Sequence, residues 1–270
     1  MPPGLISPVL IPDAGSLPEA VYRLYVALSA TSPLDAEHGL GGKLLYVGEI
    51  GDAGTMAGEG RTLLFAANIA GAASLAASGD AVVQRQAIRD GVMDFLVTSL
   101  EEALRILKNE IRKRQAVSVG VAMAPGELVE QMLDRGVLPD LLPPASWGDR
   151  GMDPEPAARL LEQGARRVMA DQDRRAEAYV TWSVQHDFVR WLPRLDSAVE
   201  ESLPSDDWVR QRWLRQAPRY LGRLAQREHG VALSGDEVTR LRSAVLELRG
   251  QHSTGAGGVP AMWIGGVPVG

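Results

Sequence analysis

Between residues 91 and 142, the spacing of apolar residues changes twice from a strand-like to a helix-like pattern, with few residues between the segments. Residues 94–98 form a short apolar run. Ser99, followed by Glu102 three residues later, is the pattern of a helix start and predicts an amphipathic helix over 100–114. This part of the chain therefore predicts a strand followed directly by a helix.

The same alternation is repeated after residue 114. An apolar run at 116–122 predicts a buried strand, Pro125 suits the first position of a helix that Gly136 ends, and residues 137–142 supply a third strand. Strands joined by helices of this length pair in parallel through right-handed crossovers. The sequence therefore predicts an α/β fold with an open, mostly parallel sheet, whose ligands bind at the carboxyl ends of the strands.

A glycine-rich segment follows the first predicted strand, which we place at residues 43–47. Residues 48–60 contain five glycines, and the backbone amides of such a loop can surround a phosphate. The segment lacks the Gly-x-Gly-x-x-Gly pattern of dinucleotide sites, and its acidic side chains would repel a pyrophosphate. Two interpretations stay open: a phosphate-binding loop, or a hairpin connection to a strand at residues 61–65.

Residues 65–80 have mostly small side chains, which let a backbone approach a neighbouring helix or a cofactor. We expect a helix packed closely on the sheet here. Asp80, at the end of this segment, also has two interpretations. It is either the partner of a ribose hydroxyl in a dinucleotide site or the cap of a helix that runs to residue 89.

Composition places the chain among ordinary globular proteins. It has 270 residues, 45% of them hydrophobic and 23% charged, and it contains no cysteine, which excludes disulfides, thiolate metal sites and cysteine nucleophiles. We find no apolar run long enough for a membrane helix and no export signal, so we expect a cytoplasmic protein without a membrane partner. The net charge of −6 gives no positive excess for nucleic-acid binding.

The charge is distributed unevenly, which indicates a domain boundary. Residues 1–144 carry 11 basic and 17 acidic residues, residues 145–270 carry 17 of each, and all six tryptophans are at or after Trp147. We expect an N-terminal arm and helix over 1–40, an α/β domain over 41–144, and a mainly α-helical region with a glycine-rich tail over 145–270. The helices of the last region are predicted at 154–170, 171–191, 206–227 and 234–250.

The sequence does not assign a catalytic residue. The four histidines are scattered, and none has the spacing of a metal site, so we predict no metal centre. His186, next to Asp187 and close to Arg190, is the first acid–base candidate. A nucleophile elbow and a Walker loop are both missing from the sequence.

A set of short segments resembles the central domain of the urocanase (urocanate hydratase) family, in the same order and at similar spacing over about residues 41–144. The segments are Gly42-Lys-Leu, Phe65-Ala-Ala-Asn-Ile-Ala-Gly71, Ser74-Leu75, Asp80, Leu100-Glu-Glu-Ala-Leu104, Ala116-Val-Ser-Val-Gly120 and Arg135-Gly-Val-Leu-Pro-Asp140. The resemblance implies a Rossmann-like domain. It also implies a cytoplasmic dimer of histidine catabolism that holds NAD+ tightly and uses it as an electrophile while water adds to urocanate.

The resemblance also implies where NAD would be held. The glycines of the family's pyrophosphate loop fall on Gly58 and Gly60, and Asn68 and Asp80 lie in matching segments. We therefore expect NAD as the cofactor, bound by these four residues. A nucleotide or another small molecule is the expected ligand, and a homodimer is the expected assembly.

Several family positions have changed. The acidic residue expected on the ribose falls on Ser78, the family's Asn-Ala falls on Ala124-Pro125, and a Gln-Thr-Ser-Ala-His motif is replaced by residues 141–146. The family's active-site cysteine has no counterpart in a chain without cysteine. Two hypotheses stay open. One is an NAD-binding relative of the urocanase hydro-lyases, which would be a hydratase if active; the other is a non-catalytic structural, assembly or regulatory module that keeps the urocanase fold.

Overall fold

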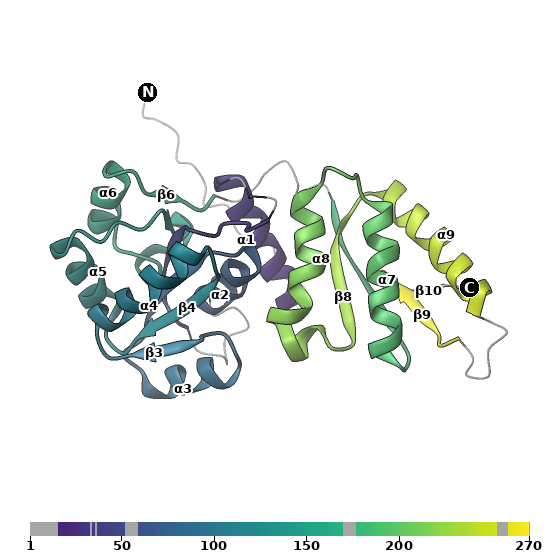
Figure 1. The fold of residues 1–270 in the computed structure, drawn as a ribbon, viewed down its shortest axis with the longest axis horizontal. Helices are drawn as coiled ribbons and strands as arrows, with labels where there is room; N and C mark the ends of the chain where they lie inside the picture. Colours follow the sequence, from purple (N-terminus) through teal and green to yellow (C-terminus); the bar gives the residue numbers. More distant parts are fainter. Residues whose placement is uncertain are drawn as a thin grey trace, which may run out of the picture.

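The chain forms two lobes that lie side by side, each built around one sheet (Figure 1). The computed structural model describes residues 16–32, 34–35, 37–51, 59–169, 177–252 and 259–269. We call the part up to residue 169 the first lobe and the part from residue 177 the second lobe. None of the helices in these ranges combines the length and the hydropathy needed to cross a membrane.

The first lobe contains a six-stranded sheet in the order β3-β4-β2-β1-β5-β6, and its strand pairs are parallel. The central strands are buried on both faces, as is typical of a parallel sheet covered by helices. The strands are β1 (Leu44–Glu49), β2 (Ala73–Ala77), β3 (Phe95–Val97), β4 (Val117–Val121), β5 (Leu141–Leu142) and β6 (Arg166–Arg167).

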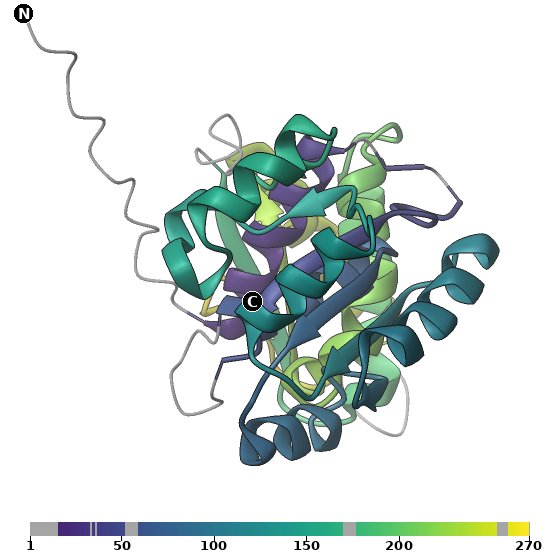
Figure 2. The same cartoon turned by 90° about the vertical axis from the view of Figure 1, so that its left-hand side faces the viewer.

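Helices cover both faces of this sheet. Leu45 and Val47 of β1 share a core with α1 (Leu17–Thr31), α2 (Glu59–Ala70) and α3 (Ala81–Arg89). Leu44 and Tyr46, which point the other way, share a second core with α4 (Leu100–Lys113), α5 (Pro125–Asp134) and α6 (Pro154–Glu162). Figure 2 looks onto the second face, with α5 and α6 drawn in teal in front of the strands. A short 3-10 helix, η1 (Ala145–Arg150), follows β5.

The predicted α/β class and Rossmann-like parallel sheet are confirmed. The predicted unit over residues 91–142 appears as β3, α4, β4, α5 and β5, with the Ser99 side chain accepting the amide of Glu102 as predicted. Two local predictions were wrong. Residues 61–65 belong to helix α2 instead of a hairpin strand, and residues 73–77 form strand β2 instead of a helix. Small side chains suit β2 because it lies between two strands and beneath helices on both faces.

The second lobe contains a four-stranded antiparallel sheet in the order β10-β9-β7-β8. Its strands are β7 (Ala178–Val184), β8 (Glu228–Leu233), β9 (Met262–Ile264) and β10 (Val267–Pro268). Its helices are α7 (Phe188–Ser202), α8 (Trp208–Leu221) and α9 (Gly235–His252), with a 3-10 turn, η3 (Gly222–Ala225), before β8. Gly265 and Gly266, at φ +60° and +74°, form the two-residue turn between β9 and β10.

This sheet corrects the prediction of a helix over 171–191. Residues 178–184 form β7, in which every second side chain, at Val180, Trp182 and Val184, is buried, so the spacing there is that of a strand. Helix α7 contains Pro193 and so extends beyond residue 191, where the predicted helix ended. The three helices of this lobe agree with the predicted helical character.

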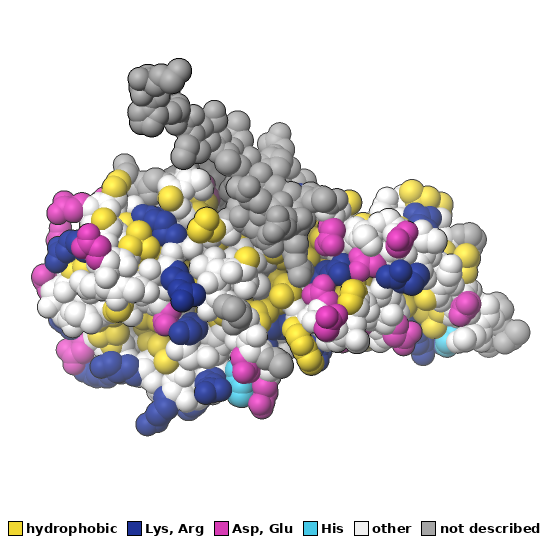
Figure 3. Space-filling view, turned by 90° about the horizontal axis from the view of Figure 1, so that it is seen from above, with side chains coloured by type: hydrophobic (Ala, Val, Ile, Leu, Met, Phe, Trp, Pro, Cys, Tyr) yellow, Lys and Arg dark blue, Asp and Glu magenta, His cyan; other side chains and the backbone are white. Residues whose placement is uncertain are grey.

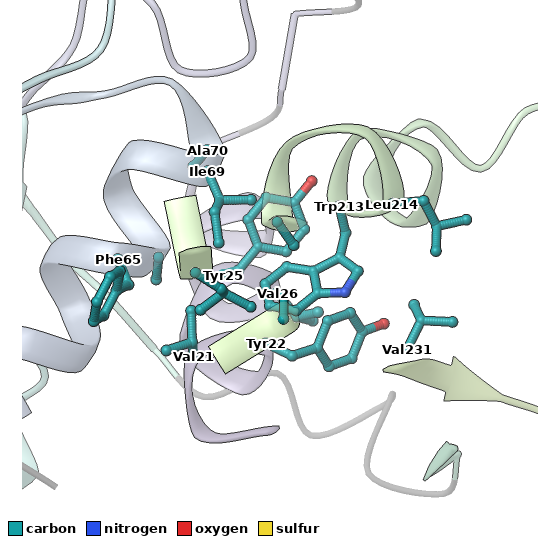
Figure 4. Close-up of a cluster of buried hydrophobic side chains, with 14 of the residues drawn as sticks. Val21, Tyr22, Tyr25, Val26, Phe65, Ile69, Ala70, Trp213, Leu214 and Val231 are labelled. Carbon is teal, nitrogen blue, oxygen red and sulfur yellow. The ribbon is translucent and has the colours of Figure 1, made fainter. Parts of the chain in front are cut away.

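Aromatic side chains join the two lobes. Trp213 of α8 packs against Tyr22 and Tyr25 of α1, and Figure 4 shows the three rings side by side. The Trp213 ring centroid is 5.0 Å from that of Tyr22 and 5.4 Å from that of Tyr25. The Tyr25 hydroxyl donates to the carbonyl oxygen of Val209 at 2.7 Å. Because these rings are buried and the Tyr25 hydroxyl is bonded to α8, the second lobe is fixed against α1 and α2. On the face drawn in Figure 3, charged side chains of both signs are interspersed over both lobes.

Candidate functional site

The carboxyl ends of β1, β2 and β5 form the candidate site. β1 lies between β2 and β5 in the sheet. The helix that follows β1, α2, packs on one face, whereas the helix that follows β5, α6, packs on the other. In open α/β sheets a crevice forms where neighbouring strands send their chains to opposite faces, and ligands bind there. We call this end of the sheet the carboxyl edge.

Helix α2 begins directly against the end of β1. Gly60, in the first turn of α2, lies so close that a Cβ atom there would come within 2.0 Å of the carbonyl oxygen of Glu49. Only glycine fits this contact, because the neighbouring atom is backbone and cannot rotate away. Gly60 thus holds the amino end of α2 at the carboxyl edge. Gly58, the other predicted loop glycine, lies outside the described residues.

Arg61 adds a positive charge next to Gly60. Its guanidinium forms an ion pair with Asp90, the residue that ends α3, and its side chain is mostly buried. Burial alone would raise the pKa of Asp90, but hydrogen bonds from Gln86 and Arg61 outweigh it and the pKa is lowered. The other terminal nitrogen of Arg61, Nη1, is buried and has no hydrogen-bond partner among the described residues. Arg61 therefore has a donor left over in the first turn of α2.

Asp80 lies just beyond the carboxyl end of β2, and it caps helix α3. Its Oδ1 accepts the amides of Val82 at 2.6 Å and Val83 at 3.4 Å. Both bonds use the same oxygen, so Oδ2 is not part of the cap. Ser78 is buried, and its hydroxyl accepts the Asp80 amide at 3.2 Å. The capping interpretation of Asp80 is therefore present in the structure, and its role towards a ribose stays a prediction.

Asn68 lies deeper in the fold than Gly60 and Asp80. It is in the last turns of α2, buried, and its Nδ2 is 3.5 Å from the hydroxyl of Ser118 in β4. Ser118 is near the amino end of β4, and its hydroxyl donates to Asp94 at 2.9 Å. Asn68 thus packs between helix and sheet, away from the carboxyl edge. The structure brings Gly60 and Asp80 to one edge but does not bring Asn68 there.

A buried phenol lies on the other face of β1. Burial raises the pKa of Tyr46 above its ordinary value, and the nearby carboxylates of Asp153 and Glu49 raise it further. The hydroxyl is 3.5 Å from the carbonyl oxygen of Pro125, at the start of α5. Tyr46 is therefore protonated at neutral pH and acts as a hydrogen-bond donor at this end of the sheet.

The end of β5 carries apolar side chains where the family has polar ones. Leu141 and Leu142 are buried in the two cores, and Pro143 follows. The Pro143 carbonyl oxygen accepts a hydrogen bond from Nη1 of Arg167, at the end of β6, at 3.3 Å. Trp147 is 4% exposed, and its indole N–H has no partner among the described residues.

Sequence reasoning missed Arg61 and Trp147 as donors at this edge. Arg61 was read as part of a strand, although a basic residue immediately after a glycine-rich loop is a recognisable signal when a helix follows. Nothing in the sequence indicated that the Trp147 indole would lack a partner.

The histidines lie elsewhere. His186 is exposed in the turn before α7, with Asp187 and Arg190 4.0 Å apart beside it. His229, in β8, is engaged through both ring nitrogens: Nδ1 is 2.8 Å from Asp196, and Nε2 is 2.8 Å from the carbonyl oxygen of Ala225. The Trp182 indole also donates to Asp196, at 2.9 Å. His229 is thus part of the packing of the second lobe.

Residues 26–146 match the family model described as the urocanase Rossmann-like domain. The match begins inside α1, contains β1 to β5 and ends in η1. The resemblance predicted for residues 41–144 is confirmed, because this part of the chain lies within the match to the urocanase Rossmann-like domain. Residues 147–270, which include β6 and the second lobe, lie outside the match.

Proposed function

We propose that this urocanase-like protein binds NAD at the carboxyl ends of β1 and β2. The observation that carries the proposal is the junction of β1 and α2, where Arg61 has a buried guanidinium nitrogen that no described residue hydrogen-bonds. A buried donor left unsatisfied costs about 1–3 kcal/mol, and an anionic ligand would remove that cost. The amino end of a helix also favours a negative charge.

The pyrophosphate of NAD fits this junction. Gly60 allows α2 to start against the last residue of β1, which places the amino end of the helix beside the strand end. Glu59, in the same turn, contributes a negative charge that opposes an anion. Arg61 offsets that charge, and arginine is the side chain best suited to a phosphate, because its planar group offers parallel donors.

The ribose end of the proposed site depends on Asp80. Family members are expected to place their acidic residue where this chain has Ser78, whose hydroxyl is already bonded to the Asp80 amide. Asp80 caps α3 through Oδ1, which leaves Oδ2 available to accept a ribose hydroxyl. We propose that Asp80 serves both the helix and the cofactor.

We propose that this chain shares NAD binding with the hydro-lyases but lacks their substrate-contacting residues at the end of β5. In the family reaction NAD supplies the electrophile for hydration. In this chain the end of β5, where the family has a motif that contacts the substrate, consists of buried leucines followed by prolines. A second candidate, favoured by that observation, is a non-catalytic module that has kept the domain without its reaction. If the protein is active, we expect a hydratase of the urocanase type.

Nucleotide analysis of the purified 270-residue chain separates these two functions. We expect mass spectrometry of a denatured extract to find NAD, or added NAD to raise the melting temperature. If the extract contains no NAD and added NAD does not shift the melting temperature, the proposal is contradicted and the non-catalytic module remains. Loss of urocanate absorbance in the presence of the NAD-loaded protein would add the hydratase activity.

A further inference from the structure

One stretch of the second lobe is rich in arginine. Residues 208–227, which form α8, η3 and the approach to β8, contain six arginines and neither aspartate nor glutamate. Two of the six serve the fold: Arg210 pairs with Glu237, and Arg212 donates to the carbonyl oxygen of Ile69. The remaining four, all exposed, are Arg215, Arg219, Arg223 and Arg227.

The last three of these arginines lie at the same end of the lobe as the start of α7. β8 begins beside the end of β7, because Glu228 pairs with Ser183, and α7 follows β7 after a short turn. The guanidinium carbon of Arg227 lies 5.4 Å from the ring centre of Phe188, the first residue of α7. Arg190, in the first turn of α7, is also exposed. We call Arg190, Arg219, Arg223 and Arg227 the basic end.

The basic end has few partners within the chain. In the ranges that the structure describes, Arg219, Arg223 and Arg227 form no ion pair, and Arg190 lies 4.0 Å from Asp187. The guanidinium groups thus keep their charge and most of their donors for a group outside the chain.

Aromatic rings hold two of these guanidinium groups in place. Arg219 lies over the ring of Tyr220 and Arg190 over that of Trp191, each at 5.3 Å from the ring centre. The donors of a guanidinium lie in its plane, so stacking on a ring leaves them available to a carboxylate.

Helix dipoles account for only part of this charge. A cation is favourable in the last turn of a helix, where Arg219 lies. Arg223 and Arg227 come after α8, and Arg190 lies at the amino end of α7, where a cation is unfavourable. The stability of the fold therefore does not explain why these arginines gather at one end.

Two exposed apolar side chains accompany the arginines. Val189, in the first turn of α7, is 92% exposed, and Leu224, in η3, is 42% exposed. Protein interfaces are enriched in arginine and aromatic residues, and their centres are apolar. The composition of the basic end is that of a surface which binds another protein.

The charges indicate what kind of partner fits. Carboxylates match the planar donors of arginine. At the opposite end of α8, residues 200–207 contain four acidic residues and no basic one, and the chain has a net charge of −6. A long polyanion such as a nucleic acid would be repelled by that charge, whereas a short acidic segment contacts the basic end alone.

We infer that the basic end docks an acidic segment of another protein that also carries apolar side chains. The four guanidinium groups receive its carboxylates, and Val189 and Leu224 contact its apolar side chains. This surface lies in the second lobe, outside the match to the urocanase domain, so it does not depend on the proposed NAD site.

Fluorescence anisotropy of the 270-residue chain with a labelled peptide of repeated Glu-Asp-Leu units tests the charges. We expect the wild type to bind this peptide and the double variant Arg190→Glu, Arg223→Glu to bind it at least about tenfold more weakly, because two attractions become repulsions. Arg190→Glu suits the amino end of α7, so the variant should keep the melting temperature of the wild type.

The matched control is the double variant Arg85→Glu, Lys108→Glu. Both side chains are exposed in helices of the first lobe, and the net charge changes by the same amount, so the control should bind as the wild type does. Absence of binding by the wild type, or equal affinity of the two double variants, would overturn the inference.

Further probes test the apolar contacts and the kind of anion. Val189→Ser should bind the Glu-Asp-Leu peptide about fivefold more weakly, but a peptide of repeated Glu-Asp-Ser units as the wild type does, because only the first peptide has apolar side chains. Unchanged binding of the first peptide by Val189→Ser would contradict the apolar contact. Tighter binding of single-stranded oligo-dT, or of vesicles that contain phosphatidylserine, than of the first peptide would overturn the assignment to an acidic protein segment.

Discussion

Nε of Arg212, on α8, donates a hydrogen bond to the carbonyl oxygen of Ile69, near the end of α2, at 3.0 Å. The guanidinium reaches this carbonyl through a slot between Gly39 and Gly71. A Cβ atom at Gly39 would come within 2.6 Å of the Arg212 guanidinium carbon, and one at Gly71 within 2.7 Å of its Nη2. Both glycines also have positive φ, +63° and +94°. One side chain of the second lobe thus caps a helix of the first.

Replacing Arg212 should weaken the junction of the lobes. Arg212→Met keeps the length of the side chain but leaves the Ile69 carbonyl oxygen without this donor, so we expect the free energy of unfolding to fall by about 1–3 kcal/mol. Urea denaturation monitored by tryptophan fluorescence measures the change. Arg215→Met, on the exposed side of α8, is the control and should change it little. Equal losses in the two variants would contradict the role of Arg212.

Glu237 should make stability depend on pH. It is buried and receives two hydrogen bonds from Arg210, at 2.8 and 2.9 Å. Burial alone would raise the pKa of Glu237, but the bonds from Arg210 and the Ser234 amide outweigh it, so the pKa is lowered. A carboxyl with a lowered folded-state pKa contributes stability above its unfolded pKa, about 4.3, and loses it as the pH falls through the folded value.

We therefore expect Glu237→Gln to be about 1–3 kcal/mol less stable than the wild type at pH 7, because the buried Arg210 cation loses one of its charged partners and keeps Asp207. The difference should shrink as the pH falls below about 4. Denaturation midpoints measured across this range give the test. Glu247→Gln, on the exposed side of α9, controls for the loss of one charge. A difference that does not depend on pH would show that the ion pair is not its source.

Gly60 should be required for the stability of the fold even when no ligand is bound. In Gly60→Ala the new methyl group meets the backbone of Glu49, so α2 has to move away from β1 and we expect a loss of at least about 1–3 kcal/mol in unfolding free energy. Thermal unfolding followed by circular dichroism measures it. Gly126→Ala is a suitable control, since a Cβ there meets no atom within 4 Å. Equal stability of the two variants would disprove the tight contact.

The two roles of Asp80 can be separated by two substitutions. Asparagine caps helices as well as aspartate does, whereas alanine removes the cap and costs about 1 kcal/mol. We expect Asp80→Asn to retain stability but to bind NAD about tenfold more weakly, because a charged acceptor for the ribose is lost. Asp80→Ala should lose both. If Asp80→Asn binds NAD as tightly as the wild type, Asp80 is only a cap.

Much of the first lobe could be predicted from local patterns. Helix α4 was identified by Ser99 and Glu102 at its start, β4 by its apolar run, and α5 by Pro125 at its first position. These signals could be read because caps and periodicity are local in the sequence. The second sheet could not be predicted in the same way. β7 contains aromatic and small residues between charged neighbours, and its strand character depends on pairing with β8 and β9, which are distant in sequence.

The candidate site was only partly predictable for a similar reason. Gly60 and Asp80 were identified because a loop glycine and a helix-capping aspartate can be recognised from residue type and local position alone. Arg61 was not, because its unsatisfied nitrogen depends on where α3 places Asp90. The family resemblance placed Asn68 in the NAD site, whereas in the structure its side chain lies 3.5 Å from the Ser118 hydroxyl, away from the carboxyl edge.

Calorimetric titration of NAD into the wild type and into Arg61→Met is the most direct measurement of the central claim. We expect the nucleotide-free wild type to bind NAD and Arg61→Met to bind it about 10–100-fold more weakly, because the variant lacks the charged donor for the pyrophosphate. Arg85→Met, on the exposed side of α3, should bind as the wild type does. Absence of binding by the wild type, or equal affinity of Arg61→Met, would contradict a dinucleotide site at the β1–α2 junction.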